Sequence, residues 1–174
     1  IDAMGGDNAP EAIVAGACDA LKKFNAIEKM YLVGDQEKIK PLIDEGVKDR
    51  IEIIHTDEII GMDEHPAQAY RQKKNASINV ASRLVKEGKA DAIVSAGSTG
   101  AQLVAGLFEI GRLRGIKRPA IAAPLPSLTG VKVLLDAGAN TEVTVKNIEQ
   151  FALMGYYFAK VLKKDKRDLK VALI

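Results

Sequence analysis

Short runs rich in Val and Ile alternate along this chain with longer amphipathic stretches, and this alternation constrains its fold more than any other feature. Such runs predict buried parallel strands and the stretches between them predict helices, so the sequence indicates an α/β protein with a mostly parallel sheet. The predicted strands are 30–33, 51–55, 92–95, 120–123, 131–136 and 169–174. The predicted helices are 10–24, 36–45, 77–87, 98–113 and 145–163.

Two of these helices carry further expectations. In the first, Asn8 followed by Glu11 predicts an N-cap, and Cys18 lies on the apolar stripe as inert packing. In the helix over 98–113, only Gln102 and Glu109 interrupt the apolar character before Arg112. We therefore expect that helix to be buried on most sides.

The composition excludes several classes of protein. The 25 Lys and Arg residues nearly balance the 23 Asp and Glu residues, giving a net charge of +2, which does not support a general role in nucleic-acid binding. One Cys and two His are too few for a disulfide or a structural zinc site, and we expect no metal and no cofactor. No apolar run approaches the ~20 residues of a membrane span, so we expect a cytoplasmic protein.

Both ends of the chain predict a fragment. The chain opens on Ile1-Asp2-Ala3, which resembles the end of a strand, and it stops inside the apolar run 171–174. We therefore expect residues 1–174 to be a single α/β segment, the N-terminal part of a longer protein.

The segment after the predicted strand 92–95 is the strongest candidate for a ligand site, because ligands of open parallel sheets bind beyond the carboxyl ends of the strands. Gly97 and Gly100 allow the backbone to approach a ligand, and Ser98 and Thr99 place hydroxyl groups where a helix begins. Unpaired N–H groups and the helix dipole favour an anion there, and phosphate is the natural candidate. The alternative is that Ser98 only caps the helix while the glycines turn the chain. The spacing fits neither a Walker A loop nor a dinucleotide-binding fingerprint.

A second glycine-rich loop follows the first apolar residues. Gly5 and Gly6 permit positive φ angles, and Asp2 and Asp7 could hold the loop or touch a ligand. A turn capped by an Asp or Asn side chain explains the same pattern equally well.

Basic residues form local groups despite the near-neutral total. Arg71, Lys73 and Lys74 could pair with phosphate or with an acidic partner, although solvated surface charge is the usual explanation. The same two explanations apply to a second group, Arg112, Arg114, Lys117 and Arg118.

Five segments together resemble the bacterial phosphate acyltransferase family of phospholipid synthesis, and their order and spacing match along the whole chain. These segments are 2–10, 32–35, 71–77, 95–101 and 135–140. The resemblance implies a three-layer α/β/α fold like that of phosphotransacetylases and isocitrate dehydrogenases, with residues 1–174 as the N-terminal part of a larger acyltransferase domain. It also implies a homodimer that contacts the membrane peripherally, through regions outside this chain.

The activity implied by the resemblance is transfer of a fatty acyl group from acyl carrier protein to inorganic phosphate, which gives acyl phosphate. Phosphate is itself the nucleophile and a thiol departs readily, so positioning and charge stabilisation remain for the protein to provide. We expect Gly97, Ser98, Thr99 and Gly100 to hold phosphate with help from Lys73 or Lys74, and Asn8 or Asn140 to contact the acyl carbonyl. The expected substrate loops contain Asp2, Gly5, Gly6, Asp7, Asp136 and Gly138. Acyl carrier protein is acidic, and its expected docking residues are Arg71, Arg112, Arg114, Lys117 and Arg118.

Two other functions remain open at this point. A short-chain phosphotransacetylase that uses coenzyme A has a similar glycine and Ser/Thr segment before a helix. A non-catalytic domain that binds phosphate is also compatible with the sequence. An oxidoreductase is disfavoured, because the usual dinucleotide fingerprint is absent from the sequence.

Overall fold

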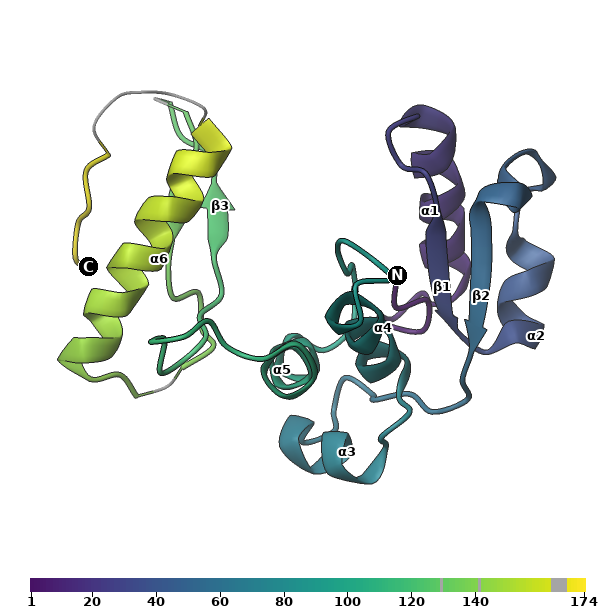
Figure 1. Cartoon of the computed structure of the whole chain (residues 1–174), viewed down its shortest axis with the longest axis horizontal. Coiled ribbons are helices and arrows are strands. Elements are labelled where there is room, and N and C mark those ends of the chain that lie inside the picture. Colours follow the sequence, from purple (N-terminus) through teal and green to yellow (C-terminus); the bar gives the residue numbers. More distant parts are fainter. Residues whose placement is uncertain (129, 141, 164–168) are drawn as a thin grey trace. The chain divides into compact units, whose positions relative to one another are not determined.

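The computed structural model describes residues 1–128, 130–140, 142–163 and 169–174, and it divides the chain into two compact units (Figure 1). Unit 1 comprises Ile1–Gly111 and unit 2 comprises Arg112–Ile174. The boundary between the units follows Gly111, where a long helical segment ends. That residues 1–174 are one segment of a larger acyltransferase domain stays a prediction. Both units combine helices and strands, so the predicted α/β class is confirmed.

The sheet of unit 1 is parallel. Strands β1 (Met30–Gly34) and β2 (Ile51–His55) pair in a register that aligns Met30 with Ile51, which confirms both predicted strands. Asp2 forms a parallel bridge with Val33, and its N–H donates to the carbonyl of Val94 at 2.9 Å. The first residues of the chain therefore lie between β1 and the segment over 92–95. The segment over 92–95 therefore lies beside Asp2, but it is not a regular strand, so the strand predicted there is wrong.

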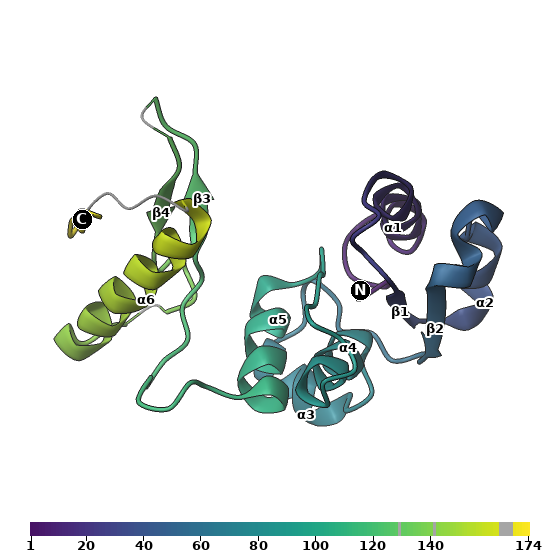
Figure 2. The ribbon, with the colours of Figure 1, turned by 45° about the horizontal axis from the view of Figure 1, so that its top comes forward.

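Alternate residues of β1 face two different helical layers. Leu32 belongs to an apolar cluster with residues of α1 (Glu11–Lys23), such as Leu21. Val33 points to the opposite face and packs with Ala81 and Leu84 of α4 (Ser77–Lys86). Because successive strand residues face opposite sides of a sheet, the sheet of unit 1 is covered on both faces, as a three-layer α/β/α fold requires. Figures 1 and 2 both show α1 beside β1.

Several helix boundaries differ from the prediction. Pro10 occupies the N-cap of α1 with no side-chain cap, so the predicted Asn8 cap is wrong; the main-chain carbonyl of Asn8 instead accepts from Ala12 N–H. Helix α2 (Gln36–Ile39) gives way to the 3₁₀ helix η1 (Lys40–Leu42), because Pro41 lacks the N–H that an α-helix would need there. A second 3₁₀ helix, η2 (Glu45–Arg50), leads directly into β2.

Among the described residues, one α-helix was not predicted. Helix α3 (Pro66–Gln72) begins at a proline, which is favoured in the first helical position because its missing N–H would be unpaired there anyway. That signal could have identified this helix from the sequence.

The apolar helix predicted over 98–113 consists of two parts. Helix α5 (Thr99–Ala105) continues into a single π-helical segment, η3 (Gly106–Ile110). Ala101 and Ala105 are buried and most other residues of the segment are half-buried, whereas Phe108 is 59% exposed, so the segment is covered on most sides but not on all. Helix α3 and helix α4 pack against this segment and leave part of its surface uncovered within unit 1.

Unit 2 contains an antiparallel pair and one long helix. Strands β3 (Ala123–Leu125) and β4 (Lys132–Leu134) pair antiparallel, which departs from the mostly parallel prediction because a short connection permits a hairpin but not a parallel crossover. Helix α6 (Val145–Lys163) matches the predicted helix. Residues 169–174 lie outside regular secondary structure, so the strand predicted there is wrong. Among the described residues, no helix combines the length and the apolar character needed to span a bilayer.

Candidate functional site in unit 1

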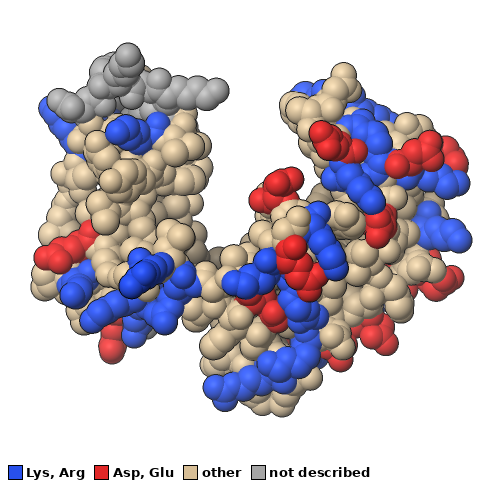
Figure 3. Space-filling view, viewed as in Figure 1, with Lys and Arg blue, Asp and Glu red and all other residues tan. Residues whose placement is uncertain are grey.

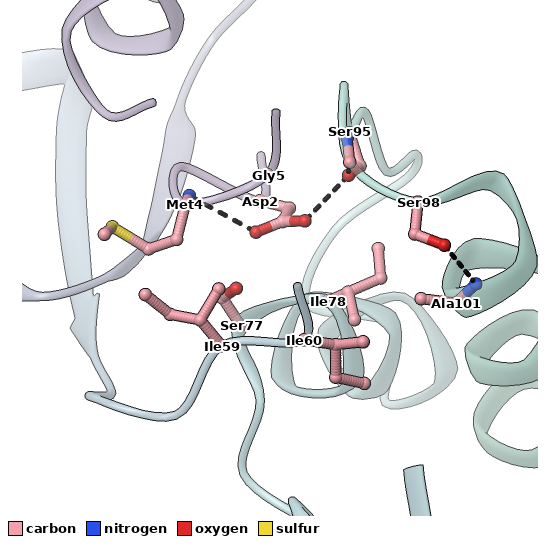
Figure 4. Close-up of a pocket in the computed structure, with 11 residues that line it drawn as sticks. Asp2, Met4, Gly5, Ile59, Ile60, Ser77, Ile78, Ser95, Ser98 and Ala101 are labelled. Carbon is pink, nitrogen blue, oxygen red and sulfur yellow. Dashed lines mark hydrogen bonds between the residues drawn. The ribbon is translucent and has the colours of Figure 1, made fainter. Parts of the chain in front are cut away.

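Three polar groups link the first loop of unit 1 to the loop that precedes α5. Asp2 is 3% exposed; its Oδ1 accepts from the N–H of Met4 at 3.3 Å and its Oδ2 accepts from Ser95 Oγ at 2.7 Å (Figure 4). Ser95 Oγ in turn accepts from the N–H of Gly97 at 3.1 Å. The chain of hydrogen bonds from Gly97 to Ser95 to Asp2 therefore holds the two loops together.

The backbones of these two loops are close enough to require glycine. A Cβ atom on Gly5 would lie 2.5 Å from Asp2 Oδ2 and 2.9 Å from the nitrogen of Gly97. Gly6 has a φ angle of 107°, and a Cβ there would lie 3.0 Å from the carbonyl oxygen of Ala96. The structure thus confirms positive φ at Gly6, and it adds a packing reason for Gly5 that the sequence did not indicate.

Ser98 caps α5, and the amides beside it remain available. Ser98 Oγ accepts from Ala101 N–H at 3.4 Å, as the capping interpretation predicts. Across the described residues, the N–H groups of Ser98, Thr99 and Gly100 have no acceptor, whereas Gly97 N–H is engaged by Ser95. The Ser98 hydroxyl can accept from Ala101 and still donate its own hydrogen to a ligand. Capping and anion binding are therefore compatible at this position.

A small cavity lies against both loops. Its volume is about 10 Å³, which is room for about one water-sized group. Its polar lining comes from Asp2, Ser77, Ser95, Gly97 and Ser98, while Ile59, Ile60 and Ile78 supply an apolar wall (Figure 4). Sequence reasoning did not assign Ser77 or Ser95 to the site, although Ser95 ends a predicted strand, where ligand contacts are common.

The basic group at 71–74 is partly neutralised. Lys73 Nζ donates to the carboxylate of Glu64 at 2.5 Å and to the carbonyl of Ile59 at 2.7 Å. The hydrogen bond from the N–H of Gly61, together with the Lys73 ammonium, holds the pKa of Glu64 below its usual value. Lys74 Nζ lies 4.1 Å from the centre of the Tyr70 ring. Neither Lys74 nor the exposed Arg71 forms an ion pair within the described residues, so these two side chains keep an uncompensated charge.

A polar network fixes the backbone that carries these lysines. Arg83 donates to Glu109 at 3.0 Å and to the carbonyl of Lys74 at 3.0 Å, and Tyr70 donates its hydroxyl to Glu109 at 3.1 Å. Partial burial and the negative charge of Glu109 raise the pKa of Tyr70. Asn79, which is fully buried, donates to the carbonyl of Lys73.

Asp7 and Asn8, the other predicted residues of the first loop, are exposed, and their side chains form no hydrogen bond to another described residue. Their proposed contact with substrate stays a prediction.

Unit 2 holds the remaining predicted loop around Asp136. This carboxylate accepts from the N–H groups of Ile121, Ala139 and Asn140 and from the side-chain amide of Asn140. Burial acts to raise the pKa of Asp136, but these hydrogen bonds outweigh it and the pKa lies below its usual value. Asn140 also donates to the carbonyl of Pro119, so both hydrogens of its amide are engaged. Gly138 has a φ angle of 98° within this loop. The participation of Asp136, Gly138 and Asn140 in the site stays a prediction.

The second basic group is exposed on unit 2. Arg112, Arg114, Lys117 and Arg118 form no ion pair with any described carboxylate. Figure 3 shows basic side chains gathered on unit 2 near the beginning of α6. These charges remain free to attract an acidic surface. In the part of the chain that the structure describes, no group of three or more His, Cys, Asp or Glu side chains is placed to hold a metal ion.

Comparisons with known proteins show which proteins this chain resembles. The model of a family described as "Fatty acid synthesis protein" matches residues 1–174. The chain is 53% identical over 161 residues to a phosphate acyltransferase of Desulforamulus reducens, an alignment that covers 92% of this chain and 48% of the relative. It is 52% identical over 161 residues to a phosphate acyltransferase of Streptococcus pyogenes serotype M5, covering 92% of this chain and 47% of the relative. The chain thus spans about half the length of the curated relatives it matches.

Proposed function

Because the chain belongs to the family described as fatty acid synthesis protein, we propose that it is part of an acyltransferase that moves a long-chain fatty acyl group from acyl carrier protein to inorganic phosphate. The product is acyl phosphate, an activated acyl donor for phospholipid synthesis. The structural observation that carries the proposal is the run of three amides, Ser98 to Gly100, that have no acceptor among the described residues.

The run of free amides suits the binding of phosphate. Three successive N–H groups at the start of a helical segment present partial positive charge to an anion. The hydroxyl groups of Ser98 and Thr99 and the free charge of Lys74 can add further donors. Lys73 is less suited to this task, because Glu64 already pairs with it.

The chemistry needs little beyond positioning. Near neutral pH inorganic phosphate is a mixture of monoanion and dianion, and its oxygen can attack the thioester carbonyl directly. The carbonyl carbon forms a bond to a phosphate oxygen, a tetrahedral oxyanion develops, and the carbon–sulfur bond breaks to release the thiolate of the carrier. A thiolate is a good leaving group, so the protein contributes mainly by orienting phosphate and by donating hydrogen bonds to the oxyanion.

The direct test uses the complete protein with acyl carrier protein thioesters. Loss of thioester should depend on inorganic phosphate, and the acyl phosphate formed should be trapped by hydroxylamine. Acyl-CoA serves as the competing donor: a higher kcat/KM with acyl-CoA would contradict the carrier-protein assignment. Binding of phosphate without any loss of thioester would identify a non-catalytic protein.

The phosphate assignment is tested by Ser98→Ala combined with Thr99→Ala. Each hydrogen bond to a charged group is worth about 1.5–3 kcal/mol, so the KM for phosphate should rise by about tenfold or more. The KM for the acyl donor should change little. Unchanged phosphate saturation in the double variant would refute the assignment.

A further inference from the structure

One hydroxyl group beside the proposed phosphate loop forms no hydrogen bond within the described part of the fold. Ser77, the first residue of α4, is 2% exposed, and its side chain makes no hydrogen bond to any other described residue. Because the residue is buried and its hydroxyl has no partner within the described chain, this hydroxyl can bond only a ligand or a water molecule in the adjoining cavity. Ser77 lines the small cavity described above, and Figure 4 shows its oxygen on the side of the cavity where Asp2 lies.

The surroundings of Ser77 offer both donors and an acceptor. The N–H of Ile78, in the first turn of α4, has no acceptor within the described chain, and Ile78 also lines the cavity. Ser98 borders the same cavity and carries the first of the three free amides. Asp2 differs from these groups, because an ionised carboxylate can only accept hydrogen bonds.

The size of the cavity limits what can enter. A volume of about 10 Å³ holds one oxygen-sized group but not a whole phosphate. One oxygen of a tetrahedral anion can occupy it while the other three face the amides at the start of α5. An oxygen placed beside Asp2 is tolerated only if it carries a hydrogen that Asp2 can accept.

We infer that this cavity is a subsite for one protonated oxygen of the substrate oxyanion, in which Ser77 donates to that oxygen and Asp2 accepts its hydrogen. Every phosphate species present near pH 7 carries a P–OH group, and sulfate carries none. The subsite thus selects phosphate over sulfate, two anions of nearly equal size. The inference rests on the proposed function, because it adds a selectivity element to the same phosphate site.

The first test needs only the wild-type complete protein. Arsenate, which keeps an As–OH group near neutral pH, should compete with phosphate, whereas sulfate should bind at least about tenfold more weakly. Competition by sulfate as strong as that by arsenate would overturn the inference. If the protein consumes no phosphate, the proposed function fails, and the selectivity is then decided by calorimetric titration with phosphate and sulfate.

The second test compares two serines of the same helix. Ser77→Ala should raise the KM for phosphate by about tenfold and leave the KM for the acyl donor within about twofold. Ser82 is the matched control, because it is equally buried on α4 and its hydroxyl donates to the carbonyl of Ile78 within the helix. Equal changes in phosphate KM for Ser77→Ala and Ser82→Ala would show a structural role only and would overturn the inference.

The third test removes the charge of Asp2 while keeping its shape. Asp2→Asn supplies an amide that can donate to an unprotonated oxygen, so the preference for phosphate over sulfate should fall by about tenfold. An unchanged preference in a folded variant would contradict the role of Asp2. Should this variant not fold, the anion competition and the serine comparison still decide the question.

Discussion

Replacing Gly5 by alanine tests whether the two loops of the site are held as closely as the structure shows. The new Cβ would lie 2.5 Å from Asp2 Oδ2, 2.8 Å from Ser95 Oγ and 2.9 Å from the nitrogen of Gly97. Carbon atoms do not approach polar atoms this closely, so the loops must separate. Separation breaks the hydrogen bonds that join Gly97 to Ser95 and Ser95 to Asp2.

The expected cost follows from those two hydrogen bonds. The bond from Ser95 to the buried carboxylate is worth about 1.5–3 kcal/mol and the neutral bond from Gly97 about 0.5–1.5 kcal/mol. Gly5→Ala should therefore lower the free energy of unfolding by about 2–4 kcal/mol, which corresponds to a urea midpoint about 1–2 M lower. In a Ser95→Ala background the same change should cost less, because one of the obstructing atoms and both hydrogen bonds are already gone.

Urea denaturation followed by circular dichroism measures this cost. Gly16→Ala is the control, because Gly16 lies on the exposed side of α1 and a Cβ added there would have no neighbouring atom within 4 Å. Alanine at that position should stabilise the helix by up to about 1 kcal/mol. A Gly5→Ala variant as stable as the wild type would refute the close contact of the two loops.

Three further predictions concern other parts of the chain. The pKa of Asp136 is lowered in the folded state, so its ionised form stabilises unit 2. This stabilisation is fully present above the unfolded pKa of about 3.9 and is lost as the pH falls through the folded pKa. Asp136→Asn should therefore weaken the loss of stability in acid, measured by urea denaturation at several pH values. Arg50 donates to the carbonyls of Leu21, Phe24 and Ile27, so Arg50→Ala should cost about 1.5–3 kcal/mol in the same assay, with no comparable loss for the exposed Lys48→Ala. The double variant Arg112→Glu, Arg114→Glu should raise the KM for acyl carrier protein by about tenfold at low salt and leave phosphate saturation unchanged. The control is the double variant Lys23→Glu, Lys40→Glu, which reverses two charges on unit 1. An equal rise in the KM for acyl carrier protein in this control would argue against docking at the second basic group.

The helices and strands that were predicted correctly are those with a strong local pattern. The strands over 30–33 and 51–55 are short, largely apolar runs, and the helices at 77–87 and 145–163 have clear amphipathic spacing. The errors lie where local pattern and tertiary context disagree. Residues 169–174 are apolar enough for a strand, yet a strand forms only where a partner supplies hydrogen bonds. The apolar segment after Ser98 looks buried in sequence, but its burial depends on which surfaces surround it.

For the site, the sequence identified the two glycine loops and the capping serine. It could not show that Gly97 N–H donates to Ser95 while the next three amides remain free, because the Ser95 side chain is held by its hydrogen bond to Asp2, 93 residues away. Ser77 was missed for the same reason. Its hydroxyl has no distinguishing local pattern and becomes informative only when the fold leaves it beside a small cavity with no partner in the described chain.

The sequence by itself determined the α/β class, the family and the segments that carry polar groups, because periodicity and motif spacing are local properties of the chain. Only the tertiary structure decided which of those groups meet. Asp2 and Ser95 are 93 residues apart and join through one hydrogen bond, and Ser77 borders the same cavity from a third segment. Contacts of this kind arise from packing of the whole unit, which no local pattern encodes.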